Sequence, residues 1–311
     1  PTADWVRTFL RERNRGLALR AGRSVDEAAA ALGTAGGALE RLGADLLCER
    51  GLAALDRGDA SAAIECLAEA ASREPDRARY RFHNARSPPA AGRDEEALAE
   101  LDRSRQLAPD RAPVEAHAGL ACRRLDRIEE ALEHYRAACS LATPEPDWLE
   151  SLGELQAETG DFETAAVSLG AAVALCPEQS AWHDALGQAL AECGRWSEAA
   201  AAFLEAHALE PGRPDVGRRL GRARLVAGDA AGAVAVLRGV VEAAPADASA
   251  AALLGAALAG LGEWQSARRE LVRAVELDPG WPGDHLLLAR LAREAGDADG
   301  AVAHARAAAE L

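Results

Sequence analysis

Two series of acidic or amide side chains recur with a spacing of four residues: Glu150, Glu154 and Glu158, then Asp184, Gln188 and Glu192. In a helix this spacing places the members of a series on one face, because four residues complete slightly more than one turn. Like charges at this spacing repel by roughly 0.2–0.5 kcal/mol, so a cationic neighbour or ligand would relieve them. The chemistry that the series predict is the binding of Lys or Arg side chains, and ordinary solvated surface charge is the alternative interpretation.

No arrangement of residues in the sequence predicts catalysis. The metalloprotease HExxH, the hydrolase GxSxG and the phosphate-binding P-loop patterns are all missing. The six cysteines form no CxxC pair and match no zinc spacing, and the seven histidines are scattered along the chain. We therefore predict a protein that is not an enzyme and that has no cofactor and no metal site.

The acidic side chains belong to helices that the sequence predicts in pairs. In residues 180–211, apolar residues recur at helical spacing before and after Gly194, which suits the end of a helix. Pro211 cannot continue a helix and ends the second one. Gly187 and Ala199 are small, which predicts that the two helices cross where these residues meet.

The same pattern recurs every 34 residues, in units that start at residues 44, 78, 112, 146, 180, 214, 248 and 282. One position is alanine in all eight units: Ala63, Ala97, Ala131, Ala165, Ala199, Ala233, Ala267 and Ala301. No insertion interrupts the phase. A single helix pair cannot bury its apolar face alone, so the units are predicted to stack on one another.

A 34-residue helix-turn-helix unit with small, alanine and proline positions at these offsets resembles the tetratricopeptide repeat. The resemblance implies an all-α, right-handed solenoid of such repeats, in which the first helix of each pair lines a concave groove. The groove-lining positions implied in this way are Glu150, Glu154, Glu158, Asp184, Gln188, Glu192, Arg123, Arg124, Arg218 and Arg222. The implied function is a non-catalytic scaffold that binds a peptide or partner segment, here one with basic residues.

The composition restricts the kind of partner. A net charge of −15 repels nucleic acid and anionic membrane surfaces and attracts basic partners. No apolar run is long enough to insert into a membrane. Cysteines inside helical units indicate free thiols in a reducing cytoplasm, and an absence of lysine among 35 basic residues indicates the GC-rich coding of a bacterium.

Residues 1–43 are predicted to form a lead-in helix and a degenerate helix pair ahead of the eight repeats of residues 44–311. Within these repeats, Ser87, Pro88 and Pro89 interrupt a first helix. Proline in a helix interior costs about 3 kcal/mol or more, so this helix is predicted to end near Ala85. The interruption is either a hinge or ligand-contacting loop, or a tolerated defect.

The last predicted helix presents an alanine-rich face over residues 301–309, and the sequence provides no polar capping helix after it. Terminal repeats need a polar outer face to stay soluble. The sequence therefore predicts either a homodimer through the C-terminal repeat, residues 286–311, or a chain that continues. A continuing chain gives the alternative function, in which the repeats are the recruitment region of a larger transferase- or hydroxylase-type enzyme.

Overall fold

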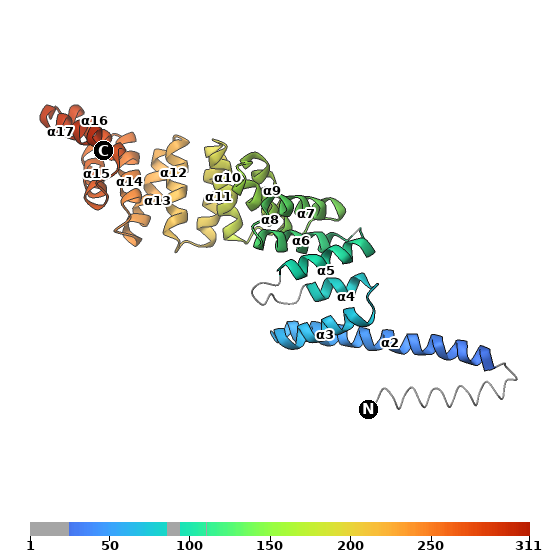
Figure 1. Cartoon of the computed structure of the whole chain (residues 1–311). Helices are drawn as coiled ribbons and strands as arrows, with labels where there is room; N and C mark the ends of the chain where they lie inside the picture. Colours follow the sequence, from blue (N-terminus) through green and yellow to red (C-terminus); the bar gives the residue numbers. More distant parts are fainter. Residues whose placement is uncertain (1–24, 86–93, 110) are drawn as a thin grey trace. The chain divides into compact units, whose positions relative to one another are not determined.

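The computed structural model describes residues 25–85, 94–109 and 111–311. These ranges contain sixteen α-helices and no strand, which confirms the all-α class predicted from the sequence. Consecutive helices form helix-turn-helix pairs that stack along the chain (Figure 1). The predicted hinge residues Ser87, Pro88 and Pro89 lie outside the described residues, and the predicted end of this helix near Ala85 stays a prediction.

The chain divides into two compact units at Thr143 and Pro144. The first unit contains α2 (Val25–Asp56), α3 (Ala60–Arg73), α4 (Ala78–Ala85), α5 (Asp94–Leu107), α6 (Ala112–Arg124) and α7 (Ile128–Leu141). The second contains α8 (Pro146–Glu158), α9 (Phe162–Leu175), α10 (Ser180–Glu192), α11 (Trp196–Leu209), α12 (Pro214–Val226), α13 (Ala230–Ala243), α14 (Ala248–Gly260), α15 (Trp264–Leu277), α16 (Pro282–Glu294) and α17 (Ala298–Glu310). The division falls where Thr143 replaces the proline that ends most other repeats.

The first helices from α4 to α16 begin 34 residues apart, at Ala78, Ala112, Pro146, Ser180, Pro214, Ala248 and Pro282. Helix α2 is different, because it runs unbroken from Val25 to Asp56 and has no turn near residue 43. The division into a lead-in segment and eight repeats stays a prediction.

In most pairs a glycine of the first helix lies in close contact with a large side chain of the second helix. A Cβ atom at Gly187 would lie 2.7 Å from the ring of Phe203, and Ala199 is completely buried. Gly187 thus lies against Phe203, one turn after Ala199, and a crossing at Gly187 and Ala199 themselves stays a prediction. The same close approach recurs at other first-helix glycines, each against a large side chain of the second helix: Gly51, Gly119, Gly153, Gly221 and Gly255.

The turns between paired helices require a left-handed backbone residue. Gly194 has a φ of 75°, as its predicted place at the end of a helix requires, and its N–H donates to the Ala191 carbonyl at 2.9 Å. Asp126 takes the equivalent place with a φ of 60°, and it is the one non-glycine residue with positive φ in the described ranges. Several second helices then begin at an aspartate whose carboxylate caps the first turn: Asp59, Asp161, Asp229 and Asp297.

Candidate functional site

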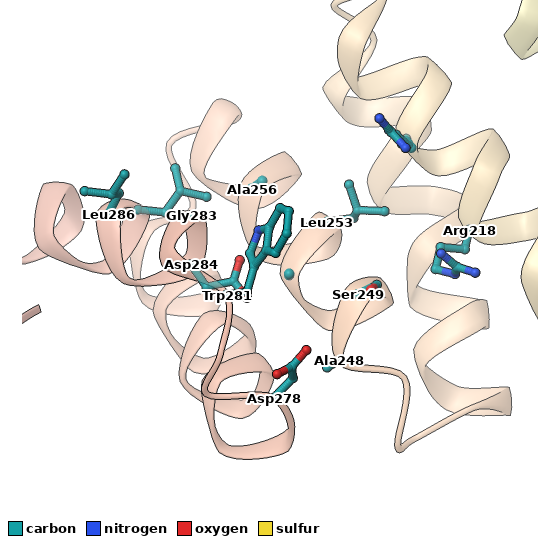
Figure 2. A pocket seen from close by; sticks show the side chains of 13 residues that line it. Arg218, Ala248, Ser249, Leu253, Ala256, Asp278, Trp281, Gly283, Asp284 and Leu286 are labelled. Carbon is teal, nitrogen blue, oxygen red and sulfur yellow. The ribbon is translucent and has the colours of Figure 1, made fainter. Parts of the chain in front are cut away.

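A groove of about 700 Å³ lies in the second unit, and helices α12, α14 and α16 provide most of its lining. Figure 2 shows Arg218 of α12 on one side and Trp281 with Asp284 on the other. Between them, α14 presents Ala248, Ser249, Ala252, Leu253 and Ala256. The groove exists because most of these middle side chains are short, whereas both neighbouring helices carry long ones.

Two arginines of α12 form the first wall of this groove. Nε of Arg218 is buried and lies 3.2 Å from Oδ2 of Asp247, an ion pair without hydrogen-bond geometry. The guanidinium carbon of Arg222 lies over the indole of Trp196, 5.7 Å from the ring centroid, in a cation–π contact. Each guanidinium is therefore positioned by another residue of the same unit, and the Asp247 carboxylate partly neutralises the charge of Arg218.

The second wall comes from α16 and the loop before it, and it combines apolar surface with carboxylates. Trp281 is 63% exposed and Leu286 is 58% exposed, so this wall presents two large apolar side chains to the groove. Asp284 is buried, and burial raises the pKa of its carboxyl group, an effect that nearby His285 partly offsets. Asp278 is exposed and accepts a hydrogen bond of 3.1 Å from the backbone N–H of Gly280.

The acidic residues predicted to line a groove lie on α8 and α10. Glu150 and Glu154 are half-buried, and Glu158 is exposed, on α8. Gln188 and Glu192 are exposed on α10. None of these five residues lines the groove between α12 and α16. We call this set the acidic series.

Asp184 differs from the acidic series, because its side chain is only 8% exposed. It accepts hydrogen bonds from Arg219 at 2.8 and 3.0 Å, and Arg213 lies 3.6 Å away. Burial raises the pKa of Asp184, although both arginines act in the opposite direction. Its carboxylate therefore joins two repeats internally and offers little surface to a ligand. The sequence-based prediction did not include Arg219.

The four predicted arginines separate into two pairs. Arg218 and Arg222 line the groove, as described above. Arg123 and Arg124 lie on α6 in the first unit, where Arg123 is half-buried and Arg124 is 3.5 Å from Asp94.

The sequence-based prediction missed the α16 wall of the groove. The resemblance gave positions within the first helices, whereas Trp281 immediately precedes α16. The available signal was the tryptophan itself, because the other described repeats place a polar or charged residue before the first helix: Arg77, Arg111, Glu145, Gln179, Arg213 and Asp247.

The described residues contain no group of three His, Cys, Asp or Glu side chains that could hold a metal ion. In the same part of the chain, no helix is both long enough and apolar enough to cross a lipid bilayer.

Repeated helix pairs with a lined groove define the chain as a helical-repeat protein. Models of the tetratricopeptide repeat match residues 48–112, 150–214 and 190–258, which together are more than half of the chain. The protein belongs to the tetratricopeptide repeat family, whose repeats indicate a protein–protein interaction scaffold. No curated protein matches the chain.

Solved structures of repeat proteins share the fold. YrrB, a tetratricopeptide repeat protein with an unusual peptide-binding site, matches with 21% identity and a TM-score of 0.56, over 60% of this chain and 96% of its own. MamA from Desulfovibrio magneticus RS-1 matches with 27% identity and a TM-score of 0.50, over 53% and 94%. The C-terminal part of a repeat protein from Cytophaga hutchinsonii matches with 16% identity and a TM-score of 0.54, over 75% and 93%.

Proposed function

We propose that the protein is a non-catalytic scaffold that holds an extended segment of a partner protein against its first helices. The observation that carries this proposal is the groove between α12 and α16, with Trp281 and Leu286 exposed at one wall. Large apolar side chains at the wall of a concave groove are typical of binding sites. The fold that the chain shares with YrrB, which has a peptide-binding site, supports the same use here.

The partner segment is proposed to be basic. The net charge of −15 favours association with cations, and the acidic series places carboxylates on two neighbouring first helices. Six free thiols support a cytoplasmic location, because they persist in a reducing compartment. No feature of the described residues favours the alternative, a recruitment region of a larger transferase- or hydroxylase-type enzyme, and it stays a prediction.

Selection from a random peptide library on the immobilised protein tests the proposed function. We expect the wild type to enrich a family of related peptides and Trp281→Ala with Leu286→Ser to lose them. Trp264→Ala is the matched control, because Trp264 is 47% exposed and does not line the groove. The absence of any enriched peptide, or equal enrichment by the double variant, would contradict the proposal.

We also propose that the C-terminal repeat pairs with a second copy of the chain. Helix α17 has no buried side chain, and its Val302 is 59% exposed. Covering such a face would remove apolar surface from water. Light scattering over a concentration series tests this, and a monomer at every concentration would contradict it.

A further inference from the structure

The start of α16 departs from the other described repeats at two positions. The third residue of the first helix is apolar elsewhere: Tyr80, Val114, Trp148, Trp182, Val216 and Ala250. In α16 this residue is Asp284, while the position before the helix, which is polar elsewhere, holds Trp281. This one repeat therefore carries its aromatic residue outside the core and a carboxylate in the position of a core residue.

Trp281 does not fill the core position that Asp284 occupies. Its side chain is 63% exposed and lines the groove (Figure 2). The indole lies close against the first turn of α16, where a Cβ atom at Gly283 would come within 2.9 Å of its Nε1 atom. Gly283 therefore leaves room for the Trp281 indole, and this indole is not part of the core that packs one repeat against the next.

Asp284 is 5% exposed, and among the described residues no hydrogen bond or ion pair reaches its carboxylate, although nearby His285 favours its charged form. The start of a helix favours a negative charge, but a buried carboxylate without a partner still costs stability. Its pKa is raised by burial. Because the residue also lines the groove, a cationic ligand group would supply the missing partner.

We propose that Asp284, Asp278 and Trp281 form a subsite for one basic side chain, Arg or Lys, of a partner segment in the groove. The two carboxylates receive its N–H groups, and the exposed indole face gives a cation–π contact. This proposal rests on the proposed function and names the chemistry that the groove selects.

The opposite wall sets the direction of the bound segment. Arg222 repels a second basic group, and Arg218 adds to this repulsion to the extent that Asp247 does not neutralise it. The basic residue therefore belongs at the α16 end and a neutral or acidic residue at the α12 end. Repulsion of a basic side chain at the α12 end thus adds to its attraction at the α16 end. The groove therefore binds such a segment more tightly than a segment in which the basic residue and the neutral or acidic residue are exchanged.

The test compares peptides selected from a random library by the full chain and by Asp284→Asn, which keeps the shape of the side chain. We expect wild-type peptides to share one Arg or Lys position, and replacing that residue by Gln to weaken binding about tenfold. Asp284→Asn is expected to abolish the preference for a basic residue there. Glu276→Gln, which removes an exposed carboxylate of α15 outside the groove, is the matched control and should retain it.

The outcomes separate the two proposals. If wild type enriches no peptide, both proposals are wrong. If it enriches peptides without a shared basic residue, or with one that Asp284→Asn still selects, the subsite is wrong and the proposed function stands. Circular dichroism checks that Asp284→Asn is folded, and Trp281→Leu, with the expected loss of affinity for the basic residue, provides an independent variant.

Discussion

Nη1 of Arg219 donates to both carboxylate oxygens of Asp184, at 3.0 and 2.8 Å, and so joins α12 to α10. The two residues are 35 positions apart, one more than the repeat length. Tyr80 and Asp45, whose side chains are hydrogen-bonded at 2.6 Å, are separated by the same number. Side chains on successive first helices thus meet at an offset of one residue from the repeat.

The two partners in this ion pair are expected to differ in what their removal costs. Arg219→Ala leaves a carboxylate that is 8% exposed, with Arg213 at 3.6 Å as its remaining ion-pair partner among the described residues. Asp184→Ala leaves a guanidinium that is 32% exposed and still paired with Asp215. We expect Arg219→Ala to lower the free energy of unfolding by about 2 kcal/mol and Asp184→Ala by about 1 kcal/mol. Urea denaturation followed by circular dichroism measures both values. An equal or reversed order would contradict the role of burial.

The pH dependence of stability should separate Asp184 from Asp215. Burial raises the pKa of Asp184 in the folded protein above its ordinary 3.8. The stability that this shift contributes is therefore present below pH 3.8 and lost as pH rises through the pKa of the folded state. A hydrogen bond from Arg213 lowers the pKa of Asp215 in the folded protein. The stability that this shift contributes is therefore present above pH 3.8 and lost as pH falls through the pKa of the folded state.

Relative to wild type, Asp184→Asn should therefore gain stability as pH rises above 3.8. Asp215→Asn, the matched control, should lose stability relative to wild type as pH rises towards 3.8. Unfolding free energies measured across the acid range give both slopes. If the stability difference from wild type changes with pH in the same direction for both variants, the arginines and not burial determine the pKa of Asp184.

Two glycine substitutions test the helix crossing. A Cβ atom at Gly187 would lie 2.7 Å from the buried Phe203 ring, so Gly187→Ala should destabilise the protein by about 1–3 kcal/mol. A Cβ atom at Gly170, inside α9, would have no heavy atom of the described residues within 4 Å, so Gly170→Ala should stabilise the protein by about 0.5–1 kcal/mol. Thermal unfolding compares the two variants. Similar effects from both would contradict a close crossing at Gly187.

The repeat period was sufficient to predict the helices, because it follows from local residue choices. Gly194 predicted a turn from its conformational freedom, and the small size of Gly187 predicted a close approach of the paired helices. Period alone could not identify Arg219 as the partner of Asp184. That pairing depends on how far one first helix is displaced along the next, and the predicted groove arginine, Arg218, lies one position away.

The groove itself was beyond prediction for a different reason. Ala252 and Ala256 look like ordinary core alanines in the sequence, and only the long side chains on α12 and α16 turn them into a floor. The displaced Trp281 was visible in the sequence, but its exposure depends on the space that Gly283 leaves.

Charge reversal tests the acidic series. Glu154→Arg with Glu158→Arg should weaken the binding of a basic partner peptide about tenfold, because two attractive charges become repulsive. Added salt should weaken wild-type binding through screening. Fluorescence anisotropy with a selected basic peptide measures both effects. Affinity that neither the substitutions nor salt changes would contradict a role for the series.

The subsite at α16 should bind its basic side chain in a pH-dependent manner. Because burial raises the pKa of Asp284, this carboxyl takes up a proton at a higher pH than an ordinary aspartate does. A protonated carboxyl has lost its charge, so the affinity of an arginine peptide should fall as pH decreases through this raised value. Asp284→Asn should bind more weakly at neutral pH and lose this dependence.

Histidine is the competing explanation for such a pH response, and it can be removed separately. His285 follows Asp284 on α16, and its Nδ1 lies 3.3 Å from Nδ1 of His304, whose pKa burial lowers. A proton on this pair would repel a cationic ligand and mimic the effect of Asp284. We expect His285→Gln to keep the pH dependence of binding, because the carboxylate that holds the ligand remains. A response that survives in Asp284→Asn and vanishes in His285→Gln would assign it to the histidines and remove Asp284 from the subsite.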